Sequence, residues 1–336
     1  MTLKDIANAL DISVSTVSRA LRDNYQIGDA TKKKVLDYAK KHNFVHNRMA
    51  RGLKEGKSRT IGVIVCSLDN NYVAQMLDGI DSFCTSKEYQ IIIMQSKELQ
   101  EQESACINLL YASGIDGLLI SPALQNTDFA QLKHLQKEGL PIVLFDRLST
   151  LIETDKVASN NFKGAYDATM HLINNGFRKI AHINTNTELS ITTERLNGYL
   201  QALKENDIPY REEYVQYYDA DKGNLESIID HFMTLPDKPN ALFTATDQIT
   251  MKCVSVLSKS AYQVPKDLAL IGFSNTDMAE VFNPSLTTVY QPAFNIGNMA
   301  AKRLIENIEN PERHTGVETI LLENEILYRA STKRLN

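Results

Sequence analysis

The sequence has no long apolar run. None of its 336 residues lies in an uninterrupted hydrophobic segment of the roughly 18 residues that a transmembrane helix requires. The N-terminus carries Lys4 and Asp5 where a secretory signal peptide would have an apolar stretch. These absences exclude a membrane-spanning or secreted protein, and we expect a cytoplasmic one.

Cysteine is scarce and is not arranged in pairs. The four residues Cys66, Cys84, Cys106 and Cys253 have neither the short spacings of a zinc site nor those of a disulfide framework. We therefore expect buried, reduced thiols.

Motifs for catalysis and cofactor binding are also missing. No G-x-S-x-G, P-loop or G-x-G-x-x-G sequence follows a strand-like segment. His42 and His46 are four residues apart but have no third metal ligand nearby. Asp219, Asp221 and Gly223 resemble the start of a calcium loop, but the glycine and the closing glutamate are misplaced. We expect no enzymatic activity, no cofactor and no metal.

Charge is distributed unevenly along the chain. Residues 1–59 contain 13 Lys and Arg against 6 Asp and Glu, a net charge of +7, and the remaining residues carry −12. A basic segment can displace counterions from a phosphate backbone, which an acidic body does not need to do. The asymmetry indicates a DNA-binding head on a separate binding core; chance unevenness is the alternative explanation.

Two short helices are predicted at the N-terminus. Apolar residues recur at helical spacing over residues 3–10, and Thr2 can cap this helix. Asp11 tolerates the left-handed backbone of a tight turn, and Ser13 can cap a second helix.

The second helix has two different faces. Val17, Ala20 and Leu21 can pack on the first helix. The opposite face carries small, hydroxylated and basic side chains, namely Val14, Ser15, Ser18, Arg19 and Arg22. Hydroxyls and arginine suit phosphates and guanine edges. The pattern predicts a helix-turn-helix whose second helix enters the major groove.

A third helix is predicted over residues 31–41, which closes a three-helix head. Residues 46–60 then form a polar, basic segment with two glycines, typical of a linker. Within it, Asn47 can cap one or two helical turns, but a helix that short needs a partner surface.

From Thr60 onward, short apolar segments alternate with helical ones. The segments IGVIVCSL, QIIIMQS, GLLISPA and PIVLFDR are separated by helical stretches near residues 71–87, 99–113 and 126–138, and KIAHINT, YVQYYD, ALFTAT and LALIGFS repeat the pattern. Such strands are typical of parallel βαβ units buried on both faces. We predict an α/β fold in which a small all-α head precedes two lobes of parallel sheet flanked by helices. In such a fold we expect the ligand-binding site between the lobes, at the carboxyl ends of the strands.

The chain resembles the lactose-repressor (LacI/GalR) family of bacterial transcription regulators in TLKDIANALDISVSTVSRAL, in the N-x-x-A-R-x-L segment beginning at Asn47, and in IGVIV, PKDLALIGFSN and PSLTTVYQP. The resemblance runs the whole length and implies a two-lobed core like that of periplasmic binding proteins. It implies a helix-turn-helix head at 1–45 and a hinge helix and linker at 46–59. The N-terminal lobe would comprise 60–158 plus about 290–318, and the C-terminal lobe 159–289 plus about 319–336.

The resemblance also implies which residues contact DNA. Val14, Ser15 and Arg19 would read operator bases, and the positions of Ser13, Thr16, Ser18 and Gln26 resemble contacts to phosphates or neighbouring groups. The full expected set is Leu3, Ser13, Val14, Ser15, Thr16, Ser18, Arg19, Gln26, Asn47, Ala50, Arg51 and Leu53. Ser13 could also be a plain N-cap, and Arg19 a solvated side chain.

In this family the hinge folds into a short helix on the minor groove, where a leucine, here Leu53, wedges between central base pairs. DNA and the second subunit supply the partner surface that such a helix needs. The chain departs from the family at His46, where proline is usual, which makes the free hinge more flexible. It also has Asp11 where glycine is usual.

The resemblance places a small-molecule effector between the lobes, at Tyr72, Asp146, Arg195, Asp247 and Ser274. Carboxylates accept sugar hydroxyls, arginine donates a planar fork, and an aromatic face covers an apolar sugar face. Two alternatives remain open: Asp146 could pair with Arg147 or cap a loop, and Asp247 could simply cap the helix that follows.

Ser274 leaves the class of ligand open. The family commonly has aspartate there, which binds two sugar hydroxyls, and Asn275 could substitute for it. A phosphorylated or acidic sugar would tolerate the loss of a carboxylate. A purine corepressor is a further alternative, although no aromatic residue near Asp219 and Ala220 is placed to stack on a base.

These observations favour a ligand-responsive, DNA-binding transcription regulator, expected to repress a carbohydrate-use operon. Its expected partners are a near-palindromic double-stranded operator, a sugar-like effector and a second copy of the chain; without a C-terminal leucine heptad, we expect a dimer. A sugar receptor without DNA function is the competing class, but it would not carry the first 59 residues. An enzyme built on the same lobes is the third class. The absence of a poised base or nucleophile from the expected pocket argues against it.

Overall fold

The computed structural model describes residues 1–21, 25–44, 57–123, 128–185, 189–220, 222–313 and 316–334. The chain divides into two compact units, Met1–Ser58 and Arg59–Asn336, called here the head and the core. The expected hinge helix, with Asn47, Ala50, Arg51 and Leu53, lies outside the described residues.

The head contains α1 (Leu3–Leu10), α2 (Val14–Ala20) and α3 (Asp29–Lys41). A capping box begins α1: the Thr2 hydroxyl accepts a hydrogen bond from the Asp5 N–H, and the Asp5 carboxylate accepts one from the Thr2 N–H at 2.7 Å. Asp11 has φ 53° and ψ 45°, which confirms the left-handed turn predicted between α1 and α2. Ser13 caps α2 by accepting from the Thr16 N–H at 3.0 Å.

The apolar faces of the three helices form one small core. Ile6, Val17 and Val35, one from each helix, are fully buried, and Leu21 packs at the edge of this cluster. Each fully buried aliphatic side chain contributes roughly 1.5–3 kcal/mol. The stability of so small a cluster depends on the side chains that all three helices contribute.

The core contains two six-stranded sheets. The first comprises β1 (Thr60–Val65), β2 (Gln90–Gln95), β3 (Gly117–Ile120), β4 (Ile142–Phe145), β5 (Asp155–Ser159) and β11 (Thr319–Leu322). The second comprises β6 (Ile180–Thr185), β7 (Val215–Tyr218), β8 (Ala241–Thr244), β9 (Ala269–Phe273), β10 (Thr287–Tyr290) and β12 (Glu325–Leu327). The strand orders are β11-β5-β4-β3-β1-β2 and β12-β10-β9-β8-β6-β7, and every described pairing is parallel except that of β10 with β12.

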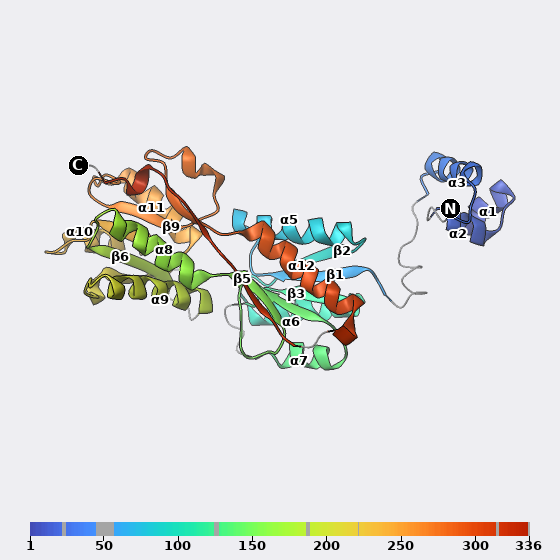
Figure 1. Ribbon diagram of the computed structural model, residues 1–336, viewed down its shortest axis with the longest axis horizontal. Helices are drawn as coiled ribbons and strands as arrows, with labels where there is room; N and C mark the ends of the chain where they lie inside the picture. Colours follow the sequence, from blue (N-terminus) through green and yellow to red (C-terminus); the bar gives the residue numbers. More distant parts are fainter. Residues whose placement is uncertain are drawn as a thin grey trace. The chain divides into compact units, whose positions relative to one another are not determined.

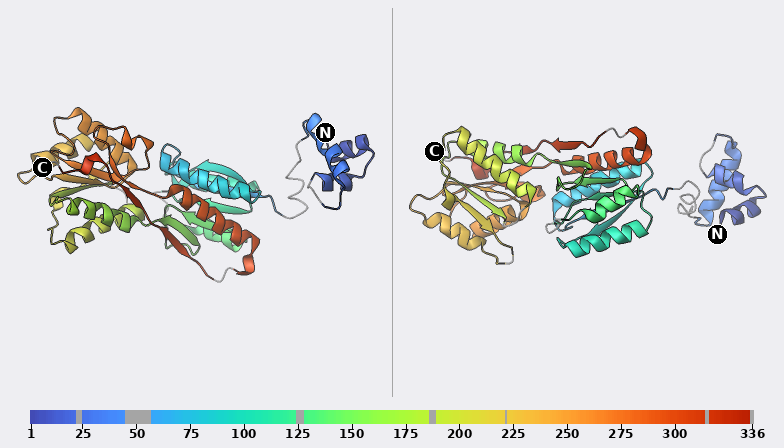
Figure 2. Two further views of the ribbon diagram at one scale, coloured as in Figure 1. Left: turned by 45° about the horizontal axis from the view of Figure 1, so that its top comes forward. Right: turned by 90° about the horizontal axis from the view of Figure 1, so that it is seen from below.

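Helices cover both faces of each sheet (Figures 1 and 2). In the first lobe, α5 (Asn71–Ser86) and α12 (Ala293–Glu309) pack on one face, and α6 (Gln100–Ala112) and α7 (Ala130–Lys137) on the other. In the second lobe, α8 (Asn161–Asn174) and α9 (Ser190–Glu205) pack on one face of the sheet, and α10 (Leu225–Thr234) and α11 (Asp247–Lys259) pack on the other. Short 3₁₀ turns are η1 (Glu212–Tyr214), η2 (Asp277–Glu280), η3 (Pro311–Arg313) and η4 (Ala330–Thr332). The arrangement confirms the predicted α/β fold.

One apolar strand is less buried than we expected. Ile92 and Ile93 of β2 are 39% and 40% exposed, so the expectation that every apolar run is covered on both faces is wrong there. The reason is position, because β2 is the last strand of its sheet and lies beside β1 alone in the strand order.

Three segments cross between the lobes (Figure 1): residues 159–161 from β5 to α8, residues 290–293 from β10 to α12, and residues 322–325 from β11 to β12. The expected placement of all residues after about 318 in the second lobe is wrong. Strand β11 pairs in parallel with β5 in the first sheet, from Thr319 with Lys156 to Leu322 with Ser159. This pairing satisfies backbone groups along β5 that would otherwise lie at an open edge.

All four cysteines are buried free thiols, which confirms the prediction. Burial raises the pKa of Cys66 and of Cys84 to about 12, so both stay protonated and unreactive. Among the described helices, none is long and apolar enough to cross a membrane.

Candidate functional site

The predicted effector residues follow the carboxyl ends of strands in both lobes. In the first lobe, Tyr72 lies at the start of α5, after β1, and Asp146 directly follows β4. In the second lobe, Arg195 lies on α9, Asp247 begins α11, and Ser274 directly follows β9. Parallel strands end at the same edge of a sheet, so each lobe gathers polar side chains at that edge.

Asp146 is the centre of the first-lobe group, which comprises Tyr72, Ser121 and Asp146. The carboxylate accepts hydrogen bonds from the Tyr72 hydroxyl at 2.9 Å and from Ser121 Oγ at 3.2 Å. Burial and the nearby carboxylate raise the pKa of Tyr72 well above its ordinary value, so its hydroxyl remains a donor. Asp146 has φ 63°, and strained backbone of this kind concentrates at functional sites.

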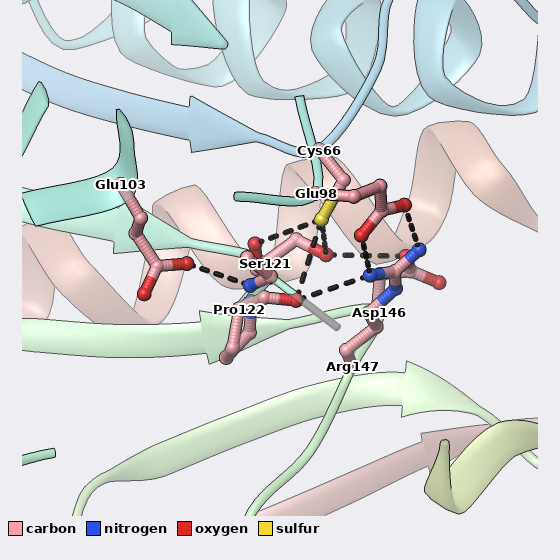
Figure 3. A network of polar contacts seen from close by, with 8 residues as sticks. Cys66, Glu98, Glu103, Ser121, Pro122, Asp146 and Arg147 are labelled. Atoms are coloured by element: carbon pink, nitrogen blue, oxygen red, sulfur yellow. Dashed lines mark hydrogen bonds and ion pairs between the residues drawn. The ribbon is translucent and has the colours of Figure 1, made fainter. Parts of the chain in front are cut away.

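The alternative pairing of Asp146 with Arg147 is wrong, because Arg147 binds a different carboxylate (Figure 3). Its Nη1 and Nη2 donate to the two oxygens of Glu98, each at 2.6 Å, and Nη1 also donates to the Pro122 carbonyl at 3.2 Å. Glu98 has a left-handed backbone, with φ 61°. This bidentate pair neutralises Arg147 and joins the loops that follow β2, β3 and β4.

The loop after β3 is held from two further sides (Figure 3). The Cys66 thiol donates to the carbonyls of Ser121 and Pro122, both at 3.3 Å. The carboxylate of Glu103 accepts from the Ala123 N–H at 2.6 Å. These contacts place Ser121 where it can donate to Asp146, so the first-lobe group is organised by the protein alone.

Arg195 is the centre of the second-lobe group, which comprises Asn161, Arg195, Asp247 and Ser274. The Arg195 side chain is buried, with Nε and Nη2 donating to Asn161 Oδ1 at 2.9 and 2.6 Å and Nη1 donating to the Ala245 carbonyl at 2.5 Å. Its Cζ lies 3.6 Å from the centroid of the Phe273 ring. These bonds use three of the five N–H groups of a guanidinium and leave one on each terminal nitrogen.

Arg195 remains a cation at neutral pH. Burial lowers its pKa to about 10, while Tyr72, Asp146 and Glu194 act in the opposite direction. Among the described residues, no carboxylate forms an ion pair with Arg195. The charge of Asp146 in the first lobe acts on Arg195 in the second lobe, and no hydrogen bond joins the two side chains in the part of the chain that the structure describes.

Asp247 and Ser274 pair with each other. Ser274 Oγ donates to Asp247 Oδ1 and accepts from the Thr276 N–H at 3.2 Å. Thr246, rather than Asp247, is the N-cap of α11, and its hydroxyl accepts from the Ile249 N–H at 3.3 Å. The alternative that Asp247 is only a cap is therefore wrong. Burial raises the pKa of Asp247, against the smaller opposing effect of Ser274.

Asn275, the expected substitute for a carboxylate at Ser274, links the two lobes through its side-chain amide. Its Nδ2 donates to Gln75 Oε1 on α5 at 2.7 Å and to the Gln291 carbonyl at 2.8 Å. Its Oδ1 accepts from the Gln291 N–H at 2.9 Å. Because Gln75 lies one turn after Tyr72, this link brings the second-lobe group beside the first-lobe group.

Sequence reasoning missed three polar residues at this edge: Ser121, Asn161 and Gln291. Gln291 is 6% exposed, and its Nε2 has no hydrogen-bond partner among the residues that the structure describes. A buried amide without a partner is suited to a ligand oxygen. Ser121 directly follows the apolar strand β3, and this position was the available signal for it. Gln291 follows β10 (TTVY) and Asn161 follows β5 (DKVAS), and neither strand is an apolar run that marks its end in the sequence.

In the head, α2 turns its predicted DNA-reading face to solvent. Val14 is 44% exposed, and Ser15 and Arg19 are also exposed. Thr16 and Ser18 are half-buried beside them. Small, hydroxylated and basic side chains therefore share one accessible helix face, as base and phosphate contacts require.

Three hydroxyls cluster at the N-terminus of α2. Ser13 Oγ lies 2.7 Å from Ser15 Oγ and 2.8 Å from Thr16 Oγ1. Leu3 packs against the small apolar core of the head, and Gln26 is exposed before α3. The cap role of Ser13 is thus compatible with a contact to phosphate.

Comparisons with known proteins match each unit separately. Residues 2–47 match the model of bacterial regulatory proteins of the lacI family, and residues 169–332 match that of the periplasmic binding protein-like domain. The HTH-type transcriptional repressor PurR of Photobacterium profundum is 29% identical over 335 residues, which span 100% of this chain and 99% of that protein.

Two solved structures are similar to the chain. The transcriptional regulator CelR–cellobiose complex superposes with a TM-score of 0.73 at 25% identity, covering 98% of this chain and 99% of that one. A LacI family transcriptional regulator from Enterococcus faecium with bound ribose gives a TM-score of 0.71 at 26% identity, covering 82% and 100%. The chain therefore joins a head that matches the lacI family of bacterial regulatory proteins to a core that matches the periplasmic binding protein-like domain, and the similar proteins over its full length are transcription regulators.

Proposed function

We propose that this protein is a cytoplasmic transcription repressor of a carbohydrate-use operon, whose affinity for operator DNA responds to a sugar-like effector bound between the lobes. One observation carries the proposal. The first-lobe group around Asp146 and the second-lobe group around Arg195 interact electrostatically without bonding to each other, and Arg195 keeps unused N–H groups. The hydroxyl groups of a ligand can accept hydrogen bonds from Arg195 in the second lobe and donate hydrogen bonds to Asp146 in the first lobe.

Recognition of the DNA major groove is assigned to the helix-turn-helix part of the head, residues 1–45. Val14, Ser15 and Arg19, all exposed on α2, read base edges in the major groove. Ser13, Thr16, Ser18 and Gln26 contact phosphates or neighbouring groups, and Leu3 supports this face from the core of the head.

The hinge, residues 46–59, is assigned to the minor groove. Asn47, Ala50 and Arg51 position the segment, and Leu53 inserts between central base pairs. Two heads of a homodimer then bind the two halves of a near-palindromic operator. Effector binding at the core changes the spacing of the two hinges and so alters DNA affinity, by a coupling of about 1–3 kcal/mol.

The charges at the site favour an uncharged, hydroxyl-rich effector over a phosphorylated one. Asp146 and Asp247 bring two carboxylates, while Arg147 is neutralised by Glu98 and leaves Arg195 as the cation of the site. A phosphate group would face repulsion from both carboxylates. The similar structures bound to cellobiose and to ribose carry neutral sugars, which supports this choice.

The test is selection of DNA fragments from the source genome by the purified full-length protein at a stated salt concentration. We expect enrichment of a near-palindromic site close to genes for carbohydrate use. Cellobiose, ribose and other neutral sugars are then added to the complex, and one of them should change operator affinity by at least about fivefold.

Two results would contradict the proposal. If no fragment is enriched with or without sugars, the head does not act in sequence-specific recognition, and a sugar receptor becomes the better description. If a site is enriched but only phosphorylated sugars change the affinity, the regulator stands and the neutral effector class is wrong.

A further inference from the structure

Asn161 lies at the junction between Arg195 and the crossover that leaves the first lobe. It is 3% exposed and is the first residue of α8, directly after the crossover from β5 (Figure 1). Its Oδ1 accepts from both Nε and Nη2 of Arg195, at 2.9 and 2.6 Å. Its Nδ2 donates to the carbonyl of Ser159, the last residue of β5, at 3.1 Å. One amide therefore connects the guanidinium to the backbone of the crossover.

The connection continues to a second crossover. Ser159 Oγ donates to Oδ1 of Asn324, between β11 and β12, at 2.5 Å. Asn324 Nδ2 donates to the Asn160 carbonyl at 2.7 Å. Glycine at position 164 makes room for this arrangement, because a Cβ on Gly164 would lie 2.5 Å from Asn324 Nδ2. A continuous hydrogen-bonded path thus runs from Arg195 to two of the three crossovers.

The neutral amide of Asn161 differs from the usual partner of a buried arginine. A carboxylate would neutralise the guanidinium, whereas Asn161 leaves the charge of Arg195 available to a ligand. An amide also supplies a donor that a carboxylate lacks, and this donor holds Ser159. If Asn161 served only to satisfy the buried Arg195, aspartate at this position would do so equally well.

We propose that Asn161 is a positioning residue with two separable roles. It presents the two remaining N–H groups of Arg195 to the effector, and it transmits a displacement of the guanidinium to the β5–α8 crossover. This inference rests on the proposed function, because it takes Arg195 as an effector-binding residue. The Oδ1 acceptor of the amide holds Arg195 for the effector, and the Nδ2 donor transmits its displacement to the Ser159 carbonyl.

Two substitutions separate these roles. Asn161→Asp keeps an acceptor for Arg195 but removes the donor to Ser159, whereas Asn161→Ala removes both. Asn206→Asp is the matched control, because the Asn206 amide donates within the second lobe, to the Ala202 carbonyl at 2.9 Å and to the sulfur of Met170 at 3.1 Å. All variants are made in the full-length chain.

The first readout needs no ligand. It is the exchange of the Arg195 Nε–H with water in the spectrum of arginine-¹⁵N-labelled protein, with the signal assigned by its loss in Arg195→Lys. Exchange should be slow in the wild type, in Asn161→Asp and in Asn206→Asp, and at least about tenfold faster in Asn161→Ala, because the bond to Asn161 protects the proton. Equal exchange in the wild type and Asn161→Ala would overturn the positioning role.

The second readout is the change in operator affinity when cellobiose or ribose is added. The comparison is made at saturating sugar, because the new carboxylate in Asn161→Asp neutralises Arg195 and should weaken sugar binding. At saturation the sugar-induced change in operator affinity should still fall by about fivefold or more. A wild-type response in Asn161→Asp would overturn the transmission role. Failure of both sugars to bind the wild type would instead overturn the effector class of the proposed function, and the exchange measurement would still decide whether Asn161 holds Arg195.

Discussion

At the scale of single residues, His182 on β6 shows what burial does to a titratable group. Its ring lies between Tyr199 and Phe243, with centroid distances of 5.1 and 4.8 Å. Nδ1 lies 3.1 Å from the Phe243 carbonyl and donates to it, while Nε2 has no partner among the described residues. Burial lowers the pKa of His182 to about 3, because a charged imidazole has no solvation there. The hydrogen bond to the Phe243 carbonyl opposes this shift, and the charge of Arg195 adds to it.

This depressed pKa predicts a pH-dependent loss of stability. Between its unfolded value of about 6.5 and its folded value, His182 binds a proton in the unfolded chain but not in the native one. The free energy of unfolding should therefore fall as pH drops below about 6.5, by roughly 1.4 kcal/mol per pH unit from this residue. In His182→Phe this part of the slope should disappear, as measured by urea denaturation at several values between pH 4.5 and 7.5.

Tyr199→Phe is the control for this prediction. It removes a buried hydroxyl, which donates to the Ile180 carbonyl at 2.7 Å, but no group that titrates in this pH range. Its stability should therefore depend on pH as that of the wild type does. An identical slope in His182→Phe and in the wild type would show that the imidazole is not shielded from water as described.

At the scale of elements, α5 and α12 approach so closely that only glycine fits at two points. A Cβ on Gly297 would lie 1.9 Å from the Met76 carbonyl oxygen, and one on Gly79 would lie 2.0 Å from the Phe294 carbonyl oxygen. Helix α5 carries Tyr72 in its first turn, and α12 begins where the β10 crossover enters the first lobe. The packing of this helix pair therefore fixes where Tyr72 stands relative to the crossovers.

Gly297→Ala should lower the free energy of unfolding of the core by about 1–3 kcal/mol, because two helix backbones must move apart to admit a methyl group. Thermal denaturation of the full-length protein measures this loss. Gly316→Ala is the matched control, since none of the described residues has an atom within 4 Å of a Cβ at that position. Equal stability of Gly297→Ala and Gly316→Ala would contradict the close crossing of α5 and α12.

At the scale of the whole molecule, two units of opposite charge have separate apolar cores. Residues 1–58 contain 12 Lys and Arg against 6 Asp and Glu, a net charge of +6, and residues 59–336 carry −11. The buried cluster of the head draws on the helices α1 to α3 and their loops, and the four clusters of the core draw on residues from Ile61 onward. Folding of the core therefore does not depend on burial supplied by the head.

The fragment Arg59–Asn336 should fold and keep the thermal stability of the core in the full-length protein within a few degrees, as measured by circular dichroism. It should also keep the proposed response to neutral sugars in a thermal-shift assay. Operator binding should be lost, because the base-reading face is removed and the fragment that remains is net negative. An unfolded fragment would show that the two units depend on each other for stability.

The sequence by itself determined the features that depend on neighbours along the chain. Helical spacing and the caps Thr2 and Ser13 predicted the first two helices, and Asp11 predicted the turn between them, because these signals act within a few residues. Alternation of apolar and helical segments predicted the two parallel sheets. The α/β pattern predicted a binding site at the carboxyl ends of the strands, because parallel strands end together, while the resemblance to a known family supplied the five expected effector residues.

Only the tertiary structure decided which side chains pair at that edge. Asp146 binds Tyr72, which is 74 residues away, and not the adjacent Arg147. Arg195 is held by Asn161, and β11 joins the first sheet beside β5. Such choices depend on competition among many possible donors, acceptors and edge strands, and the energies are set by burial and distance. Neither quantity exists until the chain has folded, so no local pattern in the sequence could specify them.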